Sequence, residues 1–150
     1  MTAVDELPPG ELETVGSVGV PRRIYAYTLP GKDAQPWERN AGGAPVAGTG
    51  LIKVGDTTKT DVLERIKQQL GTAYPNLEGV TLLLDTEARR NEGSYFRDHD
   101  VHRALVAKGI RKVGEWFEAT IEEVQAAIIA VRNGMPYDST RTADFGMRPE

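Results

Sequence analysis

Both histidines of this 150-residue chain lie in one short segment, Phe96–Phe117. Asp98 and His102 are four positions apart there, so on a helix their side chains share one face. A carboxylate beside an imidazole could hold a metal ion or transfer a proton, although on many helices such a pair is only a modest side-chain interaction. His99 lies about a quarter turn back from the His102 face, and we expect it at the surface.

The composition restricts which kind of metal site is possible. The chain has no cysteine, which excludes disulfides, zinc–thiolate sites and thiol nucleophiles. With two histidines in total, a histidine-rich site is also disfavoured. Any bound metal would therefore have mostly carboxylate ligands, which is typical of Mg²⁺ or Mn²⁺.

The formal net charge of −4 argues mildly against a nucleic-acid partner, yet basic residues cluster along the chain. If these clusters converge on one face, that face would attract phosphate, but charge alone favours a set of solvated surface charges. The clustered basic residues are Arg22, Arg23, Lys53, Lys59, Arg65, Lys67, Arg89, Arg90, Arg97, Arg103, Lys108, Arg111 and Lys112.

The length suits one domain with a core of its own. No run is long and apolar enough to cross a bilayer, and the N-terminus lacks a basic start followed by an apolar region. We therefore expect a cytoplasmic protein with no membrane partner.

Three segments have the pattern of β-strands, near residues 22–29, 50–55 and 80–85. RIYAYTL is rich in aromatic and β-branched residues, LIKVG is short, and VTLLLD is nearly all apolar. We expect the first two to pair antiparallel across residues 31–50, a segment that is typical of a loop because glycine and proline are frequent in it.

Helices are predicted by apolar faces at helical spacing and by capping residues. The three helical segments lie near residues 61–70, 98–108 and 121–132. Asp61 with Glu64 and Thr120 with Glu123 have the spacing of capping boxes before the first and third. The elements together predict an α/β (α+β) fold, a small three-stranded mixed or antiparallel sheet flanked by helices.

Five short motifs follow one another in a recognisable order between Arg22 and Arg132. They are RIYAY, LIKVGDTT, VLERIKQQ, DHDVH and GEWF. In this order they resemble the GIY-YIG endonuclease superfamily, in particular a branch with a Lys-Val-Gly second motif and a Glu-Trp-Phe element. The resemblance implies the small sheet described above and a nuclease that acts on DNA.

The resemblance also implies a role for individual residues. Tyr25 stands at the tyrosine of the first motif, which activates a water with help from the second motif, and Tyr27 lies beside it on what we expect to be the other strand face. Lys53 replaces the tyrosine of the second motif and could bind substrate or help to activate water. Arg65 stands at the arginine that binds the scissile phosphate.

The metal ligand that the resemblance implies is Asp98, which would hold a single Mg²⁺ or Mn²⁺ near the leaving oxygen. It replaces the usual glutamate, and Asp100 or Glu115 are alternative ligands. His102 would face the phosphate from the same helix. The Glu-Trp-Phe element at residues 115–117 is expected mostly to pack and close the site.

The sequence further predicts how the chain is divided. We expect an irregular arm over residues 1–20, the nuclease domain over 21–134 and a linker over 135–150. The last seven residues, DFGMRPE, resemble the start of the adenine-reading motif of superfamily-two helicases, so the resemblance implies a native fusion to a helicase. A coincidental polar tail is the alternative.

The favoured function is a metal-dependent endonuclease domain that hydrolyses DNA phosphodiester bonds. The main alternative is a degenerate domain of the same fold that binds DNA or protein without cutting. An unrelated interaction module, in which the aromatic residues only form the core, is a third interpretation.

Overall fold

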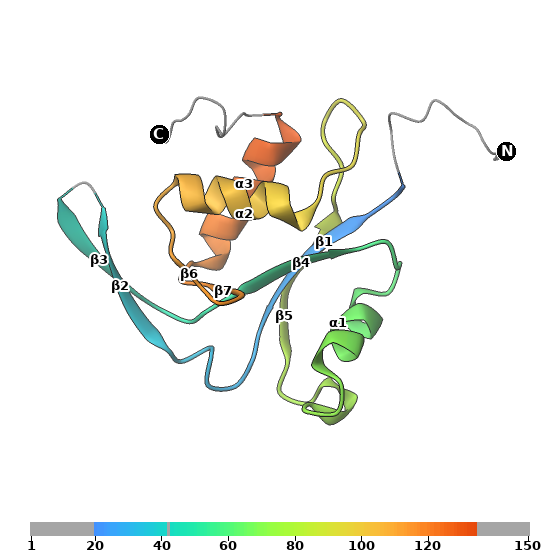
Figure 1. Cartoon of the computed structure of the whole chain (residues 1–150), viewed down its shortest axis with the longest axis horizontal. Coiled ribbons are helices and arrows are strands. Elements are labelled where there is room, and N and C mark those ends of the chain that lie inside the picture. Colours follow the sequence, from blue (N-terminus) through green and yellow to red (C-terminus); the bar gives the residue numbers. More distant parts are fainter. Residues whose placement is uncertain (1–19, 42, 135–150) are drawn as a thin grey trace, which may run out of the picture.

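The computed structural model describes residues 20–41 and 43–134. Its central sheet has three antiparallel strands, with β1 (Arg23–Thr28) between β4 (Lys53–Thr57) and β5 (Thr81–Glu87). Helices lie on both sides of the sheet (Figure 1). The predicted α/β fold, the three predicted strands and the antiparallel pairing of the first two are confirmed.

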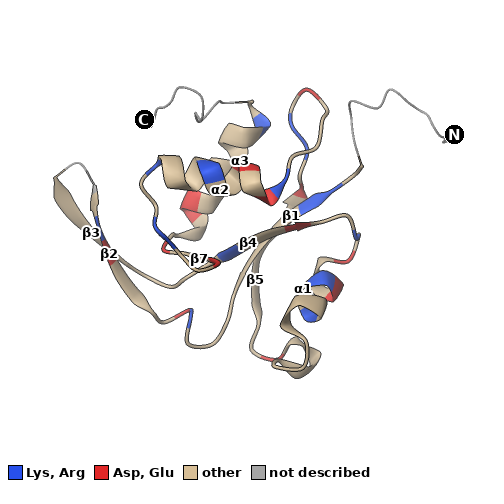
Figure 2. Cartoon of the chain, in the orientation of Figure 1, with Lys and Arg blue, Asp and Glu red and all other residues tan. Residues whose placement is uncertain are grey.

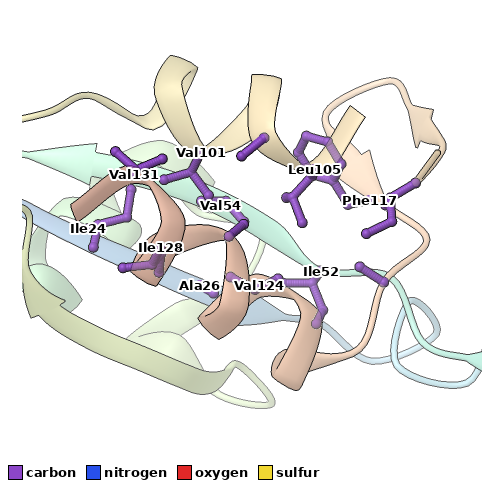
Figure 3. Close-up of a cluster of buried hydrophobic side chains, with 14 of the residues drawn as sticks. Ile24, Ala26, Ile52, Val54, Val101, Leu105, Phe117, Val124, Ile128 and Val131 are labelled. Carbon is purple, nitrogen blue, oxygen red and sulfur yellow. The ribbon is translucent and has the colours of Figure 1, made fainter. Parts of the chain in front are cut away.

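One face of the sheet carries the larger hydrophobic core. Helices α2 (Asp98–Ala107) and α3 (Ile121–Arg132), which lie where the sequence predicts helices, cover it. Ile24 and Ala26 of β1 point into this core and are fully buried. Figure 3 shows them among buried side chains from both helices, such as Val101 of α2 and Ile128 of α3.

The opposite face of β1 carries two tyrosines and packs against α1 (Val62–Leu70). Tyr25 and Tyr27 are both fully buried there, with Val62 and Ile66 of the helix. Their rings stack with centroids 6.1 Å apart. The expectation that Tyr27 lies on the other strand face is therefore wrong, because residues two positions apart in a strand share a face.

Side-chain caps begin two of the helices where the sequence predicts them. The Asp61 carboxylate accepts a hydrogen bond from the Glu64 amide at 3.2 Å and starts α1. Thr120 and Glu123 make both bonds of a capping box at the start of α3. These local bonds satisfy amides that have no partner within the helix.

The segment 31–50 is not the loop that its composition predicts. It contains the hairpin of β2 (Pro36–Ala41) and β3 (Ala44–Thr49), which extends away from the other elements in Figure 1. Trp37 holds the hairpin base, because its ring lies across Gly48 and its Nε1 donates to the Gly50 carbonyl at 2.9 Å. Glycine at position 48 thus makes room for an aromatic ring.

Arg39 fixes the hairpin to the domain. Its guanidinium donates to both carboxylate oxygens of Glu123, at 2.6 and 3.1 Å, and to the Glu118 carbonyl at 2.7 Å. The same guanidinium stacks over the Trp37 ring at 4.6 Å. The hairpin is therefore tied to the first turn of α3.

Short elements complete the chain. A 3₁₀ turn, η1 (Pro75–Leu77), precedes β5, and β6 (Lys112–Val113) pairs with β7 (Trp116–Phe117). Phe117 and Ile52 exchange backbone hydrogen bonds of 2.8 and 3.0 Å, which bring the Glu-Trp-Phe element to the start of β4. None of the helices in the described residues is long and apolar enough to span a membrane.

Gly48→Ala should destabilise the protein by about 1–3 kcal/mol, since the new methyl group would overlap the Trp37 ring and force it out of place. Urea unfolding followed by tryptophan fluorescence measures the change. Ala47→Ser is the control, because Ala47 is exposed on the neighbouring position, and it should stay within about 0.5 kcal/mol of wild type. Equal stabilities of the two variants would contradict the role of Gly48.

Candidate active site

The candidate residues lie on both sides of the edge strand β4. The register places Tyr25 opposite Gly55 and Tyr27 opposite Lys53, so this set faces α1. The alternate residues Val54 and Asp56 face α2. One short strand thus positions two groups of functional side chains.

The Tyr25 phenol crosses the backbone of β4 at Gly55. A Cβ atom at Gly55 would lie 2.6 Å from the Tyr25 hydroxyl, which explains why glycine follows Lys-Val in this strand. The hydroxyl donates to Gln69 Oε1 of α1 at 2.9 Å. It also interacts with the Arg65 side chain, one turn earlier on the same helix. Helix α1 therefore brings both Arg65 and Gln69 to the Tyr25 hydroxyl.

Both tyrosines of this group are protonated at neutral pH. Burial raises the pKa of Tyr25 to about 12, although the charge of Arg65 opposes the change. Burial and the carboxylate of Glu115 likewise raise the pKa of Tyr27 to about 12. Among the described residues, the buried Tyr27 hydroxyl has no hydrogen-bond partner.

Lys53 forms an ion pair with Glu115, with Nζ and Oε1 2.6 Å apart. The side chain of Lys53 is 19% exposed and that of Glu115 is 72% exposed. The hydrogen bond and charge of Lys53 hold the pKa of Glu115 below its ordinary value. Trp116 and Phe117 do pack, against Tyr27 and in the core, but the expectation of packing is wrong for Glu115.

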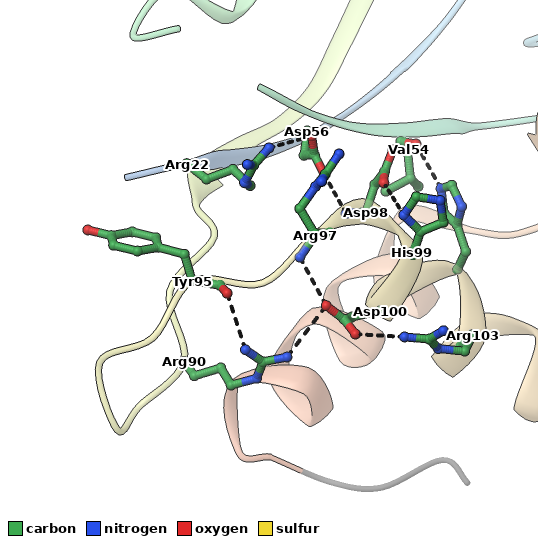
Figure 4. Close-up of polar contacts among 11 residues, drawn as sticks. Arg22, Val54, Asp56, Arg90, Tyr95, Arg97, Asp98, His99, Asp100 and Arg103 are labelled. Atoms are coloured by element: carbon green, nitrogen blue, oxygen red, sulfur yellow. Dashed lines mark hydrogen bonds and ion pairs between the residues drawn. The ribbon is translucent and has the colours of Figure 1, made fainter. Parts of the chain in front are cut away.

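The other side of β4 is organised by Asp56, a residue that sequence analysis did not single out. Its carboxylate accepts from Arg22 Nη1 at 3.0 Å, from Arg97 Nε at 2.9 Å and from the Asp98 amide at 2.7 Å. Figure 4 shows these contacts converging at the start of α2. The sequence indicates its role only through its position in the strand. Side chains alternate between the two faces of a strand, so Asp56, directly after Gly55, points away from the face of Lys53.

Asp56 and Asp98 differ in their electrostatic environment. Burial alone would raise the pKa of Asp56, but the Asp98 amide, Arg97 and Arg22 hold that pKa below its ordinary value. Burial and the charge of Asp56 raise the pKa of Asp98, which the two nearby histidines offset only in part. The Asp98 carboxylate would therefore be stabilised by a cation.

His102 lies on the face of α2 that meets β4. Its Nε2 is 2.9 Å from the Val54 carbonyl, which can only accept, so this nitrogen carries a proton and donates. Its ring packs on Phe117 with centroids 5.0 Å apart, and burial lowers the pKa of His102. His99 is exposed, as expected, and its Nδ1 lies 3.3 Å from Asp98 Oδ1.

The alternative metal ligands are engaged elsewhere. The Asp100 carboxylate accepts from the Arg97 amide and pairs with Arg90 and Arg103, and Glu115 pairs with Lys53. Within residues 20–41 and 43–134, no three histidine or acidic side chains gather as a metal-binding group. A metal held here would thus rely on Asp98 and on water or substrate.

The basic residues do not form a purely basic face around α2, where Figure 2 shows ribbon positions of Lys or Arg interspersed with positions of Asp or Glu. Several arginines there are paired with aspartates. The pairs are Arg22–Asp56, Arg97–Asp56, Arg90–Asp100 and Arg103–Asp100. The positive charges are therefore balanced locally on this side of the sheet.

A family model, the T5orf172 domain, matches residues 23–132. The chain belongs to the T5orf172 domain family. T5orf172 domains are nuclease-like and related to GIY-YIG-type and HNH-type endonucleases. The match covers the whole sheet and all three helices, and thus both groups of side chains around β4. No curated protein and no solved structure matches this T5orf172 domain.

Asp56→Asn should lower the free energy of unfolding by about 2 kcal/mol at pH 7, because two arginines lose their charged partner. Since the pKa of Asp56 is lowered in the folded protein, its contribution is present above the ordinary carboxyl pKa and is lost as the pH falls below about 4. Urea unfolding of both proteins between pH 7 and 3 should show the difference shrinking.

Asp85→Asn is the matched control for this comparison. The ion pair of Asp85 with Arg23 is solvent-exposed, so this substitution should lower the free energy of unfolding by less than about 1 kcal/mol. If both substitutions lower the free energy of unfolding by the same amount at pH 7, the contacts of Asp56 do not stabilise the start of α2.

Tyr25 and Tyr27 should make the protein sensitive to alkali. Their pKa is about 12 when folded and about 10 when unfolded, so the folded state binds more protons in this range and stability falls as the pH rises past 10. The double variant Tyr25→Phe/Tyr27→Phe should flatten that decline, measured by urea unfolding from pH 9 to 11.5. An equally steep decline in the double variant would contradict the burial of these phenols.

Proposed function

We propose that this domain is an endonuclease of GIY-YIG type that hydrolyses DNA phosphodiester bonds with Mg²⁺ or Mn²⁺. The observation that supports it is that β4 positions all five candidate residues, three on the face toward α1 and two where α2 meets its other face. Tyr25 and Arg65 meet above Gly55, Lys53 lies on the same face, and Asp98 and His102 meet the strand from α2. The family model that spans the domain supports the same function.

Arg65 and Lys53 supply positive charge for the phosphate in this proposal. A guanidinium can bind two phosphate oxygens at once, whereas an ammonium acts as a point charge. In phosphodiester hydrolysis negative charge builds up on the phosphate and leaving oxygens, so fixed cations beside them lower the barrier. Both cations already flank the tyrosine group before substrate arrives.

Tyr25 is the proposed water-orienting group. With a pKa of about 12, only about one molecule in 10⁵ carries a phenolate at pH 7, so the neutral oxygen acts by accepting a hydrogen bond from the water. The phenol is fully buried and bonded to Gln69, which means that water reaches it only after Gln69 moves. Tyr27 and Lys53 are the alternative groups for this role.

Asp98 is the proposed metal ligand. Its carboxylate offers the hard oxygen that Mg²⁺ and Mn²⁺ prefer, is about a quarter exposed, and has its amide fixed by Asp56. A divalent ion there would stabilise the charge of the leaving oxygen. Asp56 keeps Asp98 at the first turn of α2, and His102 fixes the helix against the Val54 carbonyl.

A binding module that does not cut is the second candidate function. It is favoured by two contacts that cover the site, from Gln69 to the Tyr25 hydroxyl and from Glu115 to Lys53. A protein that never opens these contacts would still present Arg65 to phosphate. Cleavage and binding assays on the same variants therefore separate the two candidates.

The proposed partners are DNA and a superfamily-two helicase in the same full-length chain, in the cytoplasm. The helicase rests on the sequence DFGMRPE at residues 144–150, which lies outside the described residues, as do the whole expected linker and all of the expected arm but its last residue. The nuclease proposal does not depend on it.

Arg65→Ala should weaken binding to a DNA duplex about 10-fold and reduce the salt dependence by about one phosphate contact. Tyr25→Phe should bind nearly as well as wild type yet lose cleavage by about 100-fold or more. Fluorescence anisotropy and plasmid nicking with Mg²⁺ or Mn²⁺ measure the two effects. Lys67→Ala, an exposed cation on the same helix, is the control and should change little.

Wild-type protein that binds DNA but never nicks it would favour the binding module. Nicking by Tyr25→Phe at the wild-type rate would move the water-orienting role to Tyr27 or Lys53.

A further inference from the structure

The Tyr27 hydroxyl is a buried donor without an acceptor in the described structure. The residue is fully buried, and its ring is held by Tyr25 on one side and by the edge of Trp116 on the other, with centroids 6.1 and 6.0 Å away. A buried hydroxyl without a partner is unfavourable, and proteins seldom keep one unless a ligand or water satisfies it. The hydroxyl is thus oriented in advance for an acceptor.

The neighbour of Tyr27 across the sheet is Lys53, which already holds an anion. That anion is the Glu115 carboxylate, 2.6 Å from Nζ. Glu115 is close enough to Tyr27 for its charge to raise the pKa of the phenol, yet it makes no hydrogen bond with the hydroxyl. A donor and a cation therefore lie together, and one carboxylate neutralises the cation.

Further cations surround the same place. Arg65 acts on Tyr27 from α1, Lys112 acts on Glu115 from β6, and Lys32 Nζ lies 5.3 Å above the Trp116 ring. If the Glu115 carboxylate moves away, the charged groups that remain around the Tyr27 hydroxyl, among those named here, are all positive. Such a site suits an oxyanion better than a neutral ligand.

Glu115 is also placed so that it can leave. It is 72% exposed and sits in the tight turn between β6 and β7, directly after Gly114, whose φ is +64°. A side chain on such a turn can rotate into solvent without disturbing the Phe117–Ile52 pairing below it. The carboxylate is therefore a replaceable anion rather than a structural one.

We propose that Tyr27 and Lys53 form a phosphate subsite that Glu115 occupies in the free protein and vacates when a DNA phosphate binds. The hydroxyl donates to one phosphate oxygen and the ammonium pairs with another. This subsite rests on the proposed function, because it supplies DNA phosphate as the ligand, and it assigns Tyr27 to binding rather than to water activation. Glu115 then sets the affinity of the site by competing with the ligand.

Glu115→Gln should bind a DNA duplex about 3- to 10-fold more tightly than wild type, since Lys53 no longer has to exchange one anion for another. Fluorescence anisotropy at fixed salt measures the affinity. Glu122→Gln is the control, because it removes the same charge from an exposed position on α3 and should change binding less than about twofold. The increase in DNA affinity should be absent from the double variant Glu115→Gln/Lys53→Met.

Tyr27→Phe provides a second readout that a merely structural role would not give. Because the hydroxyl has no hydrogen-bond partner among residues 20–41 and 43–134, the variant should have a Tm equal to or above that of wild type. It should nevertheless bind the duplex about 3- to 10-fold more weakly. A lowered Tm together with unchanged binding would overturn the subsite.

The outcomes keep this subsite separate from the nuclease proposal. Tighter binding by Glu115→Gln in a protein that never nicks DNA would support the subsite and refute the nuclease. Weaker binding by Arg65→Ala with no change in Glu115→Gln or Tyr27→Phe would refute the subsite alone. If wild type binds no duplex, inorganic phosphate is titrated into Glu115→Gln while the NMR shifts of the backbone amides are followed. Shifts that do not centre on Tyr27 and Lys53 would overturn the subsite.

Discussion

The register between β1 and β4 is the constraint on which the rest of this domain depends. It sets Tyr25 against the bare backbone of Gly55, where any side chain would collide with the phenol. The same register sends Asp56 to the other face, where it binds the first amide of α2. A slip by one residue would exchange the two faces and take both groups of side chains away from their helices.

Local patterns were enough to predict the sheet and the three helices. Capping residues such as Thr120 and alternating side chains such as those of β1 act within a few positions, so their consequences can be read from the sequence. The hairpin of β2 and β3 was missed because it depends on the contact of Trp37 with Gly48 rather than on strand propensity. Its glycines and prolines are typical of a loop when that contact is unknown.

The candidate site was predictable only in part, for a related reason. Motif order indicated Tyr25, Lys53 and Arg65, and they do meet at one face of β4. Asp56 and Glu115 act through partners that are distant in sequence, Arg97 and Lys53, which no local pattern reveals. The face of Tyr27, in contrast, can be predicted from the sequence. Side chains two positions apart in a strand point to the same face, so Tyr27 had to share the face of Tyr25 and the expected opposite face was an error.

The link between Arg39 and Glu123 has a consequence for how the chain reaches this structure. A long connection separates β1 from β4, and closing a longer loop costs more entropy before the pairing can compensate for it. A hairpin that pairs with itself inside the connection shortens the part that must be closed, so the two strands that carry the motifs meet more easily. Once Arg39 engages Glu123, the insertion and the start of α3 are locked together, and neither can unfold without weakening the other.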